Sequence, residues 1–474
     1  MRSPPLCRRA EFLLMRDAIM KRPFLSFVFF LSILFGLTIT ACGSGGGEGG
    51  GRTIEPPPPA QFPVSGPDVP GVSAYDNAII PVLQKWNIPG ASVAVAKNGK
   101  LVLARGYGYA DVDAKTIVQP DSMFRIASIS KPITAAAVLH LVEQQKIDLD
   151  AKFLDILTDY TLPANADARL KNVTIRHLLE HAGGWDRDKS GDPMFMSDQI
   201  ATALSVPAPA TCSNVIQYML GKSLDFDPGT KYAYSNFGYC ILGRVIEKVT
   251  GVSYEVYVRD NLLAPMDIHA MRIGTSLLSG RVANEVKYYD YTGAPTTSSV
   301  FPGGGQVAMP YGGFYLEAMD AHGGWIASAV DLTRFMTALD GHRGPAYLSS
   351  NSLIEMTARP DVPHWTTSVS WYGLGIMVRP AEVDANWWHT GALRGGTTIL
   401  VRGYNGYCWA VLLNSRPSDT SKIDAEIDQA MWKALGTGLQ GSTTDLYTQY
   451  PSPNLPPLGQ TAVRATTTTA AKEH

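Results

Sequence analysis

Two hairpin signals lie at opposite ends of the body of this 474-residue chain, and they constrain its fold more than any other feature. Asn98-Gly99 and Asn405-Gly406 each separate two apolar runs rich in β-branched residues. Asn-Gly is typical of two-residue β-hairpins because both residues tolerate a positive φ. Helical periodicity fills the chain between them. The order predicts one antiparallel sheet built from both ends of the body and covered by helices, with an all-α domain inserted in the middle.

Five segments have the periodicity or the capping residues of helices: 128–146, 174–180, 237–249, 329–339 and 423–435. Thr174 is the expected N-cap of the second segment, and Gly251 ends the third. A further strand is expected over 372–378. The fold class is therefore α/β (α+β).

The N-terminal residues have the pattern of an export signal. Lys21-Arg22 precedes an apolar run, which ends at Ile39-Thr40-Ala41-Cys42. We interpret residues 1–41 as a signal peptide whose true start is Met20 or Met15. The ending resembles the lipobox of bacterial lipoproteins, which implies cleavage before Cys42 and a lipid on Cys42. A signal anchor is the alternative. The expected location is the bacterial cell envelope, with the protein held at a membrane by the lipid.

The remaining boundaries follow from composition. Residues 42–71 are rich in Gly and Pro and are expected to form a tether. Residues 72–440 form the folded domain, with an α/β part at about 72–145 and 325–437 and a helical part at about 146–324. Residues 441–474 are expected to be a disordered tail.

Charge and cysteine content limit the classes of function that the chain can have. The chain has 40 Lys+Arg against 42 Asp+Glu, so it lacks the basic excess expected of a nucleic-acid binder. An exported protein meets an oxidising compartment, where Cys212 and Cys240 could pair; a buried free thiol is equally compatible with the sequence. Small molecules or peptides are the expected partners.

Ser128-Ile129-Ser130-Lys131 is an S-x-x-K tetrapeptide at the start of an expected helix. Residues three apart share a helical face. A serine hydroxyl is a weak nucleophile until a neighbour takes its proton, and a lysine with a lowered pKa can do this. Pro132 is tolerated only in a first turn, so Ser128 should lie at the N-terminus of the helix, where the dipole favours developing negative charge.

Two further motifs carry groups suited to acyl transfer. Tyr234-Ser235-Asn236 opens a helix and offers a phenol that can relay protons and a carboxamide that can bind a substrate. His389-Thr390-Gly391-Ala392 lies on an expected strand, whose edge can supply N–H groups to an oxyanion hole. Gly391 is expected to permit close approach of the substrate, and His389 to supply a donor or a cation.

In the order S-x-x-K, Y-x-N and H-T-G, the motifs resemble the serine penicillin-recognising family of class C β-lactamases, D-alanyl-D-alanine carboxypeptidases and related esterases. Four more segments resemble the same family: 89–96, 177–184, 226–229 and 323–325. The resemblance covers about residues 74–435. It implies an α/β domain and an all-α domain, with the serine between them.

The resemblance also implies roles for individual residues: Ser128 as acylated nucleophile, Lys131 and Tyr234 as the proton-handling pair, Asn236 as an amide contact, and the N–H groups of Ser128 and Ala392 as oxyanion hole. His389 stands where class C β-lactamases carry Lys, which favours a carboxypeptidase or an esterase. No metal or cofactor is implied. The base can be Lys131 or Tyr234. The substrate can be an acyl-D-amino-acid peptide, a β-lactam or an ester, and segments 186–212 and 286–322 are expected to shape its pocket.

Two rival functions remain. His177-Leu-Leu-Glu180-His181 matches the H-x-x-E-H pattern of a zinc metallopeptidase, although Gly183-Gly184 ends the helix directly after it. The domain could also be a non-catalytic receptor of the penicillin-binding type, which acylates once or binds without turnover.

Overall fold

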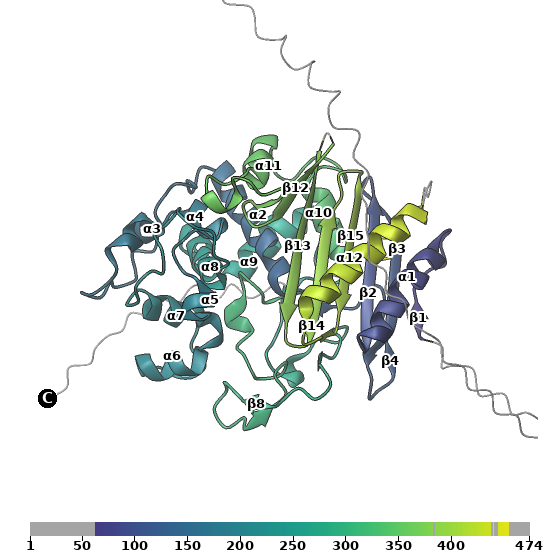
Figure 1. Cartoon of the computed structure of the whole chain (residues 1–474), viewed down its shortest axis with the longest axis horizontal. Coiled ribbons are helices and arrows are strands. Elements are labelled where there is room, and N and C mark those ends of the chain that lie inside the picture. Colours follow the sequence, from purple (N-terminus) through teal and green to yellow (C-terminus); the bar gives the residue numbers. More distant parts are fainter. Residues whose placement is uncertain (1–61, 383, 438, 440–443, 455–474) are drawn as a thin grey trace, which may run out of the picture. The chain divides into compact units, whose positions relative to one another are not determined.

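The computed structural model describes residues 62–382, 384–437, 439 and 444–454 of the chain (Figure 1). Its largest sheet is antiparallel throughout and has nine strands in the order β1-β3-β2-β15-β14-β13-β12-β11, with β4 paired to β3. The strands are β1 Val64–Ser65, β2 Gly90–Lys97, β3 Lys100–Asp111, β4 Thr116–Ile117, β11 Trp371–Tyr372, β12 Met377–Ala381, β13 Asp384–Leu393, β14 Gly396–Arg402 and β15 Tyr407–Leu413.

The pairing of β2 with β15 joins the two ends of the body, as the sequence predicts. Val93 pairs with Val411 in the middle of this ladder, and both side chains are buried. Asn98 and Gly99 turn the first hairpin with φ values of 47° and 78°. These positive values explain why Asn-Gly was the decisive signal.

The expected strand over 372–378 is wrong as a single element. β11 and β12 are two strands of a hairpin, in which Tyr372 pairs with Met377. Gly375 adopts a φ of 78° in the turn between them, a conformation that only glycine adopts without strain. The apolar pattern continues through this turn, so periodicity alone did not reveal it.

Helices cover both faces of the sheet. α1 Val72–Lys85 and α12 Thr420–Thr437 pack together, and α12 contacts β14. Figure 1 shows α12 in front of the sheet and α10 Ala329–Leu339 behind it, where α10 contacts β2 and β15. α2 Ser130–Glu143 is buried over most of its surface and packs against α8 Asn236–Thr250 and α9 Tyr254–Val258 of the inserted part. α2 therefore lies at the junction between the two parts.

The inserted part is helical at first and then irregular, as expected for 286–322. Its α-helices are α3 Phe153–Ile156, α4 Ile175–Leu179, α5 Arg187–Ser190, α6 Ser197–Leu204, α7 Cys212–Met219, α8 Asn236–Thr250 and α9 Tyr254–Val258. Short strands follow, namely β6 Arg272–Ile273, β7 Tyr289–Asp290, β8 Thr297–Ser298 and β9 Gln306–Val307, and β6 joins β10 Trp325–Ala327 and β5 Phe124–Arg125 in a small sheet. A disulfide between Cys212 and Cys240 ties α7 to α8, while Cys408 is buried and free.

Both boundaries of the folded domain differ from the prediction. β1 and residues up to 71, assigned to the tether, belong to the fold: Val64 pairs with Tyr107, and the Arg105 guanidinium donates to the Gly66 carbonyl at 2.8 Å. Part of the expected disordered tail is also ordered. Within residues 444–454, Leu446 and Tyr447 are buried. In both segments the buried residues are isolated and form no periodic pattern. The prediction from composition therefore placed them outside the folded domain.

Other predictions lie outside the described residues: the signal peptide 1–41, Cys42, the tether up to residue 61 and the tail beyond residue 454. Among the helices that the structure describes, none is both long and apolar enough to cross a membrane.

Candidate active site

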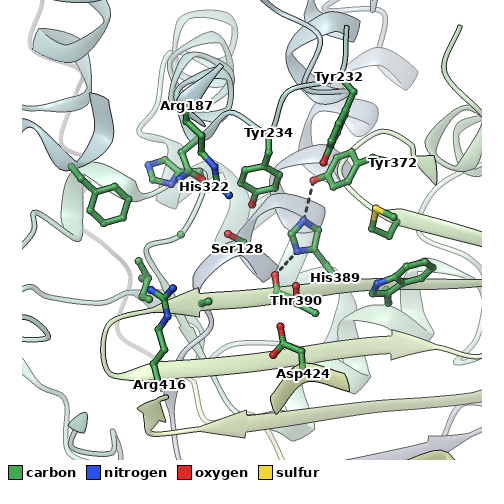
Figure 2. A pocket seen from close by; sticks show the side chains of 17 residues that line it. Ser128, Arg187, Tyr232, Tyr234, His322, Tyr372, His389, Thr390, Arg416 and Asp424 are labelled. Carbon is green, nitrogen blue, oxygen red and sulfur yellow. Dashed lines mark hydrogen bonds between the residues drawn. The ribbon is translucent and has the colours of Figure 1, made fainter. Parts of the chain in front are cut away.

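Ser128 lies between strand β5 of the small sheet and helix α2. β5 leads into the short 3-10 helix η1 Ala127–Ile129, and α2 begins at Ser130. Ala127 has a φ of 47°, which is strained for a residue with a Cβ, and its side chain is held in a small apolar cluster with Leu393. This backbone presents the Ser128 hydroxyl to the cavity at the entrance of a helix (Figure 2).

Lys131 is completely buried and directs its amine at the serine. Its Nζ lies 3.2 Å from Ser128 Oγ, 2.7 Å from Asn236 Oδ1 and 2.9 Å from the His322 carbonyl. Burial lowers the pKa of Lys131 well below its ordinary value, and the negative charge of Asp192 opposes this effect. The environment therefore favours a neutral amine, which can accept the serine proton.

Tyr234 points its hydroxyl at Ser128 from the turn before α8 (Figure 2). Ser235 caps α8 by accepting from the Gly238 N–H at 3.2 Å, which fixes the turn. Burial raises the pKa of Tyr234, so its phenol stays protonated. Of the two predicted proton-handling groups, Lys131 is thus suited to accept a proton and Tyr234 to donate one.

Asn236 lines the cavity, but its amide is already engaged. Its Oδ1 accepts from Lys131, and its Nδ2 donates to Asp192 Oδ2 at 2.6 Å. One N–H of the amide remains for a substrate. The sequence predicted a substrate contact, and the structure adds that this side chain orients the lysine.

The surroundings of His389 favour a neutral ring, whereas the sequence predicts a donor or a cation for a substrate. Its Nδ1 donates to the Thr390 carbonyl at 2.6 Å, and its Nε2 accepts from the Tyr372 hydroxyl at 3.0 Å. Burial, assisted by the nearby Lys131, lowers the pKa of His389 to about 3. Both ring nitrogens are occupied, and the ring has no proton to offer a substrate.

The edge of β13 fits the predicted oxyanion hole. β12 pairs with β13 only as far as Trp388, so the next residues have no strand on that side. Leu393 and Gly396 close the β13–β14 hairpin as a pair. Because hydrogen-bonded pairs alternate along an antiparallel ladder, the Ala392 N–H points away from β14. Thr390 and Ala392 both line the cavity that Ser128 lines.

The structure shows a steric requirement for glycine at position 391 that the sequence did not predict. A Cβ at this position would lie 2.4 Å from the Ile126 carbonyl oxygen and 2.3 Å from Thr398 Oγ1. The glycine therefore permits close approach of β13 to the segment carrying Ser128. Its predicted role toward a substrate stays a prediction.

The cavity has a volume of about 520 Å³ and aromatic walls. The sequence missed several groups that line it, namely Arg187, Phe195, Tyr232, Tyr372, Arg416 and Asp424. Arg187 stacks over the Tyr234 ring at 4.5 Å, and the Arg416 guanidinium forms no hydrogen bond or ion pair within the part of the chain that the structure describes. Burial raises the pKa of Asp424 to about 6.

The 186–212 segment does contribute Arg187 and Phe195 to the cavity, as expected, but within 286–322 only His322 lines it.

The H-x-x-E-H pattern does not form a metal site here. His177 Nδ1 accepts from the Thr174 N–H in a capping box, and His181 Nδ1 accepts from the Ser235 N–H at 3.1 Å. The residues that the structure describes contain no group of three or more His, Cys, Asp or Glu able to hold a metal. These histidines serve helix capping and the turn that carries Tyr234.

A family model described as Beta-lactamase matches residues 76–430. A curated relative, Protein flp of Staphylococcus aureus strain MW2, is 32% identical over 186 residues, which are 39% of this chain and 35% of that protein. The chain spans at most about half the length of the first curated relatives it matches.

Solved structures share the fold. The penicillin-binding protein homologue of Pyrococcus abyssi has a TM-score of 0.59 and 24% identity over 77% of this chain and 78% of its own. The D-amino acid amidase of Ochrobactrum anthropi SV3 has a TM-score of 0.58 and 22% identity over 76% of this chain and 99% of its own.

Proposed function

The chain belongs to the β-lactamase family, and on this premise we propose that it is a serine hydrolase that cleaves an amide or an ester through an acyl-enzyme on Ser128. One observation carries the proposal: the fully buried amine of Lys131, whose pKa is lowered by burial, lies 3.2 Å from the serine hydroxyl oxygen. A nucleophile beside a base that is itself oriented by a third group is the general pattern of such catalysis.

The proposed first step is attack of Ser128 Oγ on the substrate carbonyl, while the hydroxyl proton passes to Lys131. The N–H groups of Ser128 and Ala392 stabilise the negative oxygen that develops. The bond to the amine or alcohol then breaks, and the leaving group takes a proton from the Lys131–Tyr234 pair. Water adds to the ester on Ser128, and the pair takes a proton from that water. The pair returns this proton to Ser128 Oγ as the acyl–oxygen bond breaks and the acid is released.

A carboxypeptidase-like or esterase-like activity fits better than a true β-lactamase. The neutral His389 offers no charge at the position where class C β-lactamases carry Lys. A D-amino acid amidase has a similar fold, and this similarity is a further reason to propose an amide substrate for this chain. An acyl-D-amino-acid peptide is therefore our first choice of substrate, and a simple ester our second.

The charges of the cavity support a substrate with a carboxylate. Arg187 reaches in from α5 and Arg416 from β16 Ser415–Arg416 (Figure 2). The nearest carboxylate to Arg187 is Asp188, whose oxygen is 3.9 Å away. Arg187 repels Arg416, while the Asp290 and Asp424 carboxylates attract Arg416 without forming an ion pair with it in the described residues. Guanidinium groups bind carboxylates in bidentate geometry.

The experiment is hydrolysis of an N-acyl-D-alanyl-D-alanine peptide, a p-nitrophenyl ester and a chromogenic cephalosporin by residues 62–454. We expect turnover of the peptide or the ester that Ser128→Ala abolishes, with little turnover of the cephalosporin. Acylation without turnover of any of them would support the receptor alternative. Turnover that persists in Ser128→Ala would contradict the proposal.

We also propose that the protein is exported and anchored through a lipid on Cys42, as the N-terminal pattern predicts. Labelled palmitate should be incorporated by the full chain in a bacterial host and not by its Cys42→Ala variant. Equal incorporation by both would contradict the anchor.

A further inference from the structure

Asp192 lies between α5 and the 3-10 helix η3 Pro193–Phe195, outside every motif of the sequence. Both oxygens of its carboxylate are engaged. Oδ1 accepts from the Met194 N–H at 3.1 Å and so caps η3, and Oδ2 accepts from Asn236 Nδ2 at 2.6 Å. The second contact joins two segments 44 residues apart in the chain.

This contact determines how the Asn236 amide is turned. An ionised carboxylate can only accept hydrogen bonds, so it requires the NH₂ end of the amide. The oxygen end then faces Lys131, whose Nζ donates to it at 2.7 Å. If the amide were flipped, its NH₂ group would face the amine and would donate to the lone pair that must accept the Ser128 proton.

We propose that Asp192 is a positioning residue for the catalytic base: it fixes the Asn236 amide, and through that amide it holds the Lys131 amine toward Ser128. This inference rests on the function proposed above. It also ties the base to the segment 187–196, which lines the cavity through Arg187 and Phe195.

The same segment places two opposite charges near the base. Asp192 raises the pKa of Lys131, and Arg187 lowers it. The other groups around the amine carry no charge: burial keeps the imidazoles His181, His322 and His389 neutral and the phenols Tyr234 and Tyr239 protonated. Removing the Asp192 charge should therefore make Lys131 lose its proton at a lower pH, which moves the acid limb of the rate profile to lower pH.

Two substitutions separate the charge of Asp192 from its geometry. Asp192→Asn keeps an oxygen that can accept from Asn236 but removes the charge, and Asp192→Ala removes both. The readout is the second-order rate of labelling of Ser128 by a fluorophosphonate probe from pH 5 to pH 10, with the melting temperature of each variant. Asp198→Asn is the matched control, because Asp198 is an exposed acid on α6 six positions further along the same stretch.

We expect Asp192→Asn to keep the plateau rate within about threefold and to shift the acid limb to lower pH. The plateau rate of Asp192→Ala should fall by up to about a hundredfold, because a displaced base accepts the serine proton less efficiently. Asp198→Asn should match the wild type. A folded Asp192→Ala that keeps the wild-type plateau rate would overturn the inference, and so would an unchanged acid limb in Asp192→Asn. Wild-type protein that is not labelled at Ser128 would instead overturn the proposed function.

Discussion

The Nζ atom of Lys131 lies 3.2 Å from the Oγ atom of Ser128, and the lysine side chain is fully buried. No carboxylate forms an ion pair with this amine within the described residues; its partners are an amide oxygen, a carbonyl and the serine itself. A buried ammonium without a counter-ion is unfavourable, so the site favours the neutral base. The proposed chemistry depends on this relationship.

The first prediction concerns the protonation state of Lys131. Activity should rise with pH as the amine loses its proton, at a pH well below the ordinary lysine value. Lys131→Met should lower the rate of acylation by about 10²–10⁴-fold, and Lys131→Arg should be equally inactive because a guanidinium does not deprotonate. Rates of ester hydrolysis across pH test this. Substantial activity in Lys131→Arg would show that another group is the base.

The second prediction concerns His389 and stability. Burial holds the folded pKa at about 3, below the unfolded value of about 6.5, so only the unfolded chain binds a proton as the pH falls through this interval. Stability is therefore lost toward acid. His389→Gln should reduce the loss between pH 7.5 and 4.5 by roughly 2–3 kcal/mol. Urea unfolding at the two pH values measures this, and an unchanged pH dependence would mean that His389 titrates normally.

The third prediction concerns the two cavity arginines. The enzyme should hydrolyse mono-p-nitrophenyl glutarate, whose acyl group is an anion, better than neutral p-nitrophenyl valerate. Arg416→Met should lower kcat/KM for the anionic ester about tenfold or more and leave the neutral ester within twofold. Arg394→Met is the matched control, because Asp290 Oδ2 holds the Arg394 guanidinium at 2.8 Å. If the ratio of kcat/KM for the anionic ester to kcat/KM for the neutral ester is the same in wild type and Arg416→Met, Arg416 does not bind a substrate carboxylate.

The fourth prediction concerns the C-terminal segment that composition assigned to a tail. Tyr447 is buried and donates to Thr333 Oγ1 at 3.1 Å. Tyr447→Ala should lower the free energy of unfolding by about 3–5 kcal/mol, and Tyr447→Phe by only about 0.5–1.5 kcal/mol. Urea unfolding at neutral pH measures both. No change in Tyr447→Ala would indicate that the segment does not contribute to the fold.

The sequence was most informative where local chemistry determines structure. Asn98-Gly99 predicted a hairpin because the turn needs positive φ values, and Thr174 predicted a helix start because its hydroxyl caps one. Ser128 and Lys131 could be paired because three residues on a helix bring two side chains together.

The sequence was least informative where the site depends on contacts between distant segments. Arg416 reaches the cavity from a two-residue strand, and Tyr372 reaches His389 from a hairpin that was predicted as one strand. Asp192 lies in a loop without periodicity. No local signal marks such residues, because their neighbours are set by the fold.

The most direct test of the account is the intact mass of residues 62–454 after treatment with a fluorophosphonate probe and, separately, with a penicillin. We expect one adduct per chain from the fluorophosphonate, located on Ser128 by peptide mapping and absent in Ser128→Ala. Penicillin labelling at the same residue would favour cell-wall peptides as substrates. A folded wild-type protein that neither reagent modifies, or an adduct that persists in Ser128→Ala, would contradict acyl-enzyme chemistry at this serine.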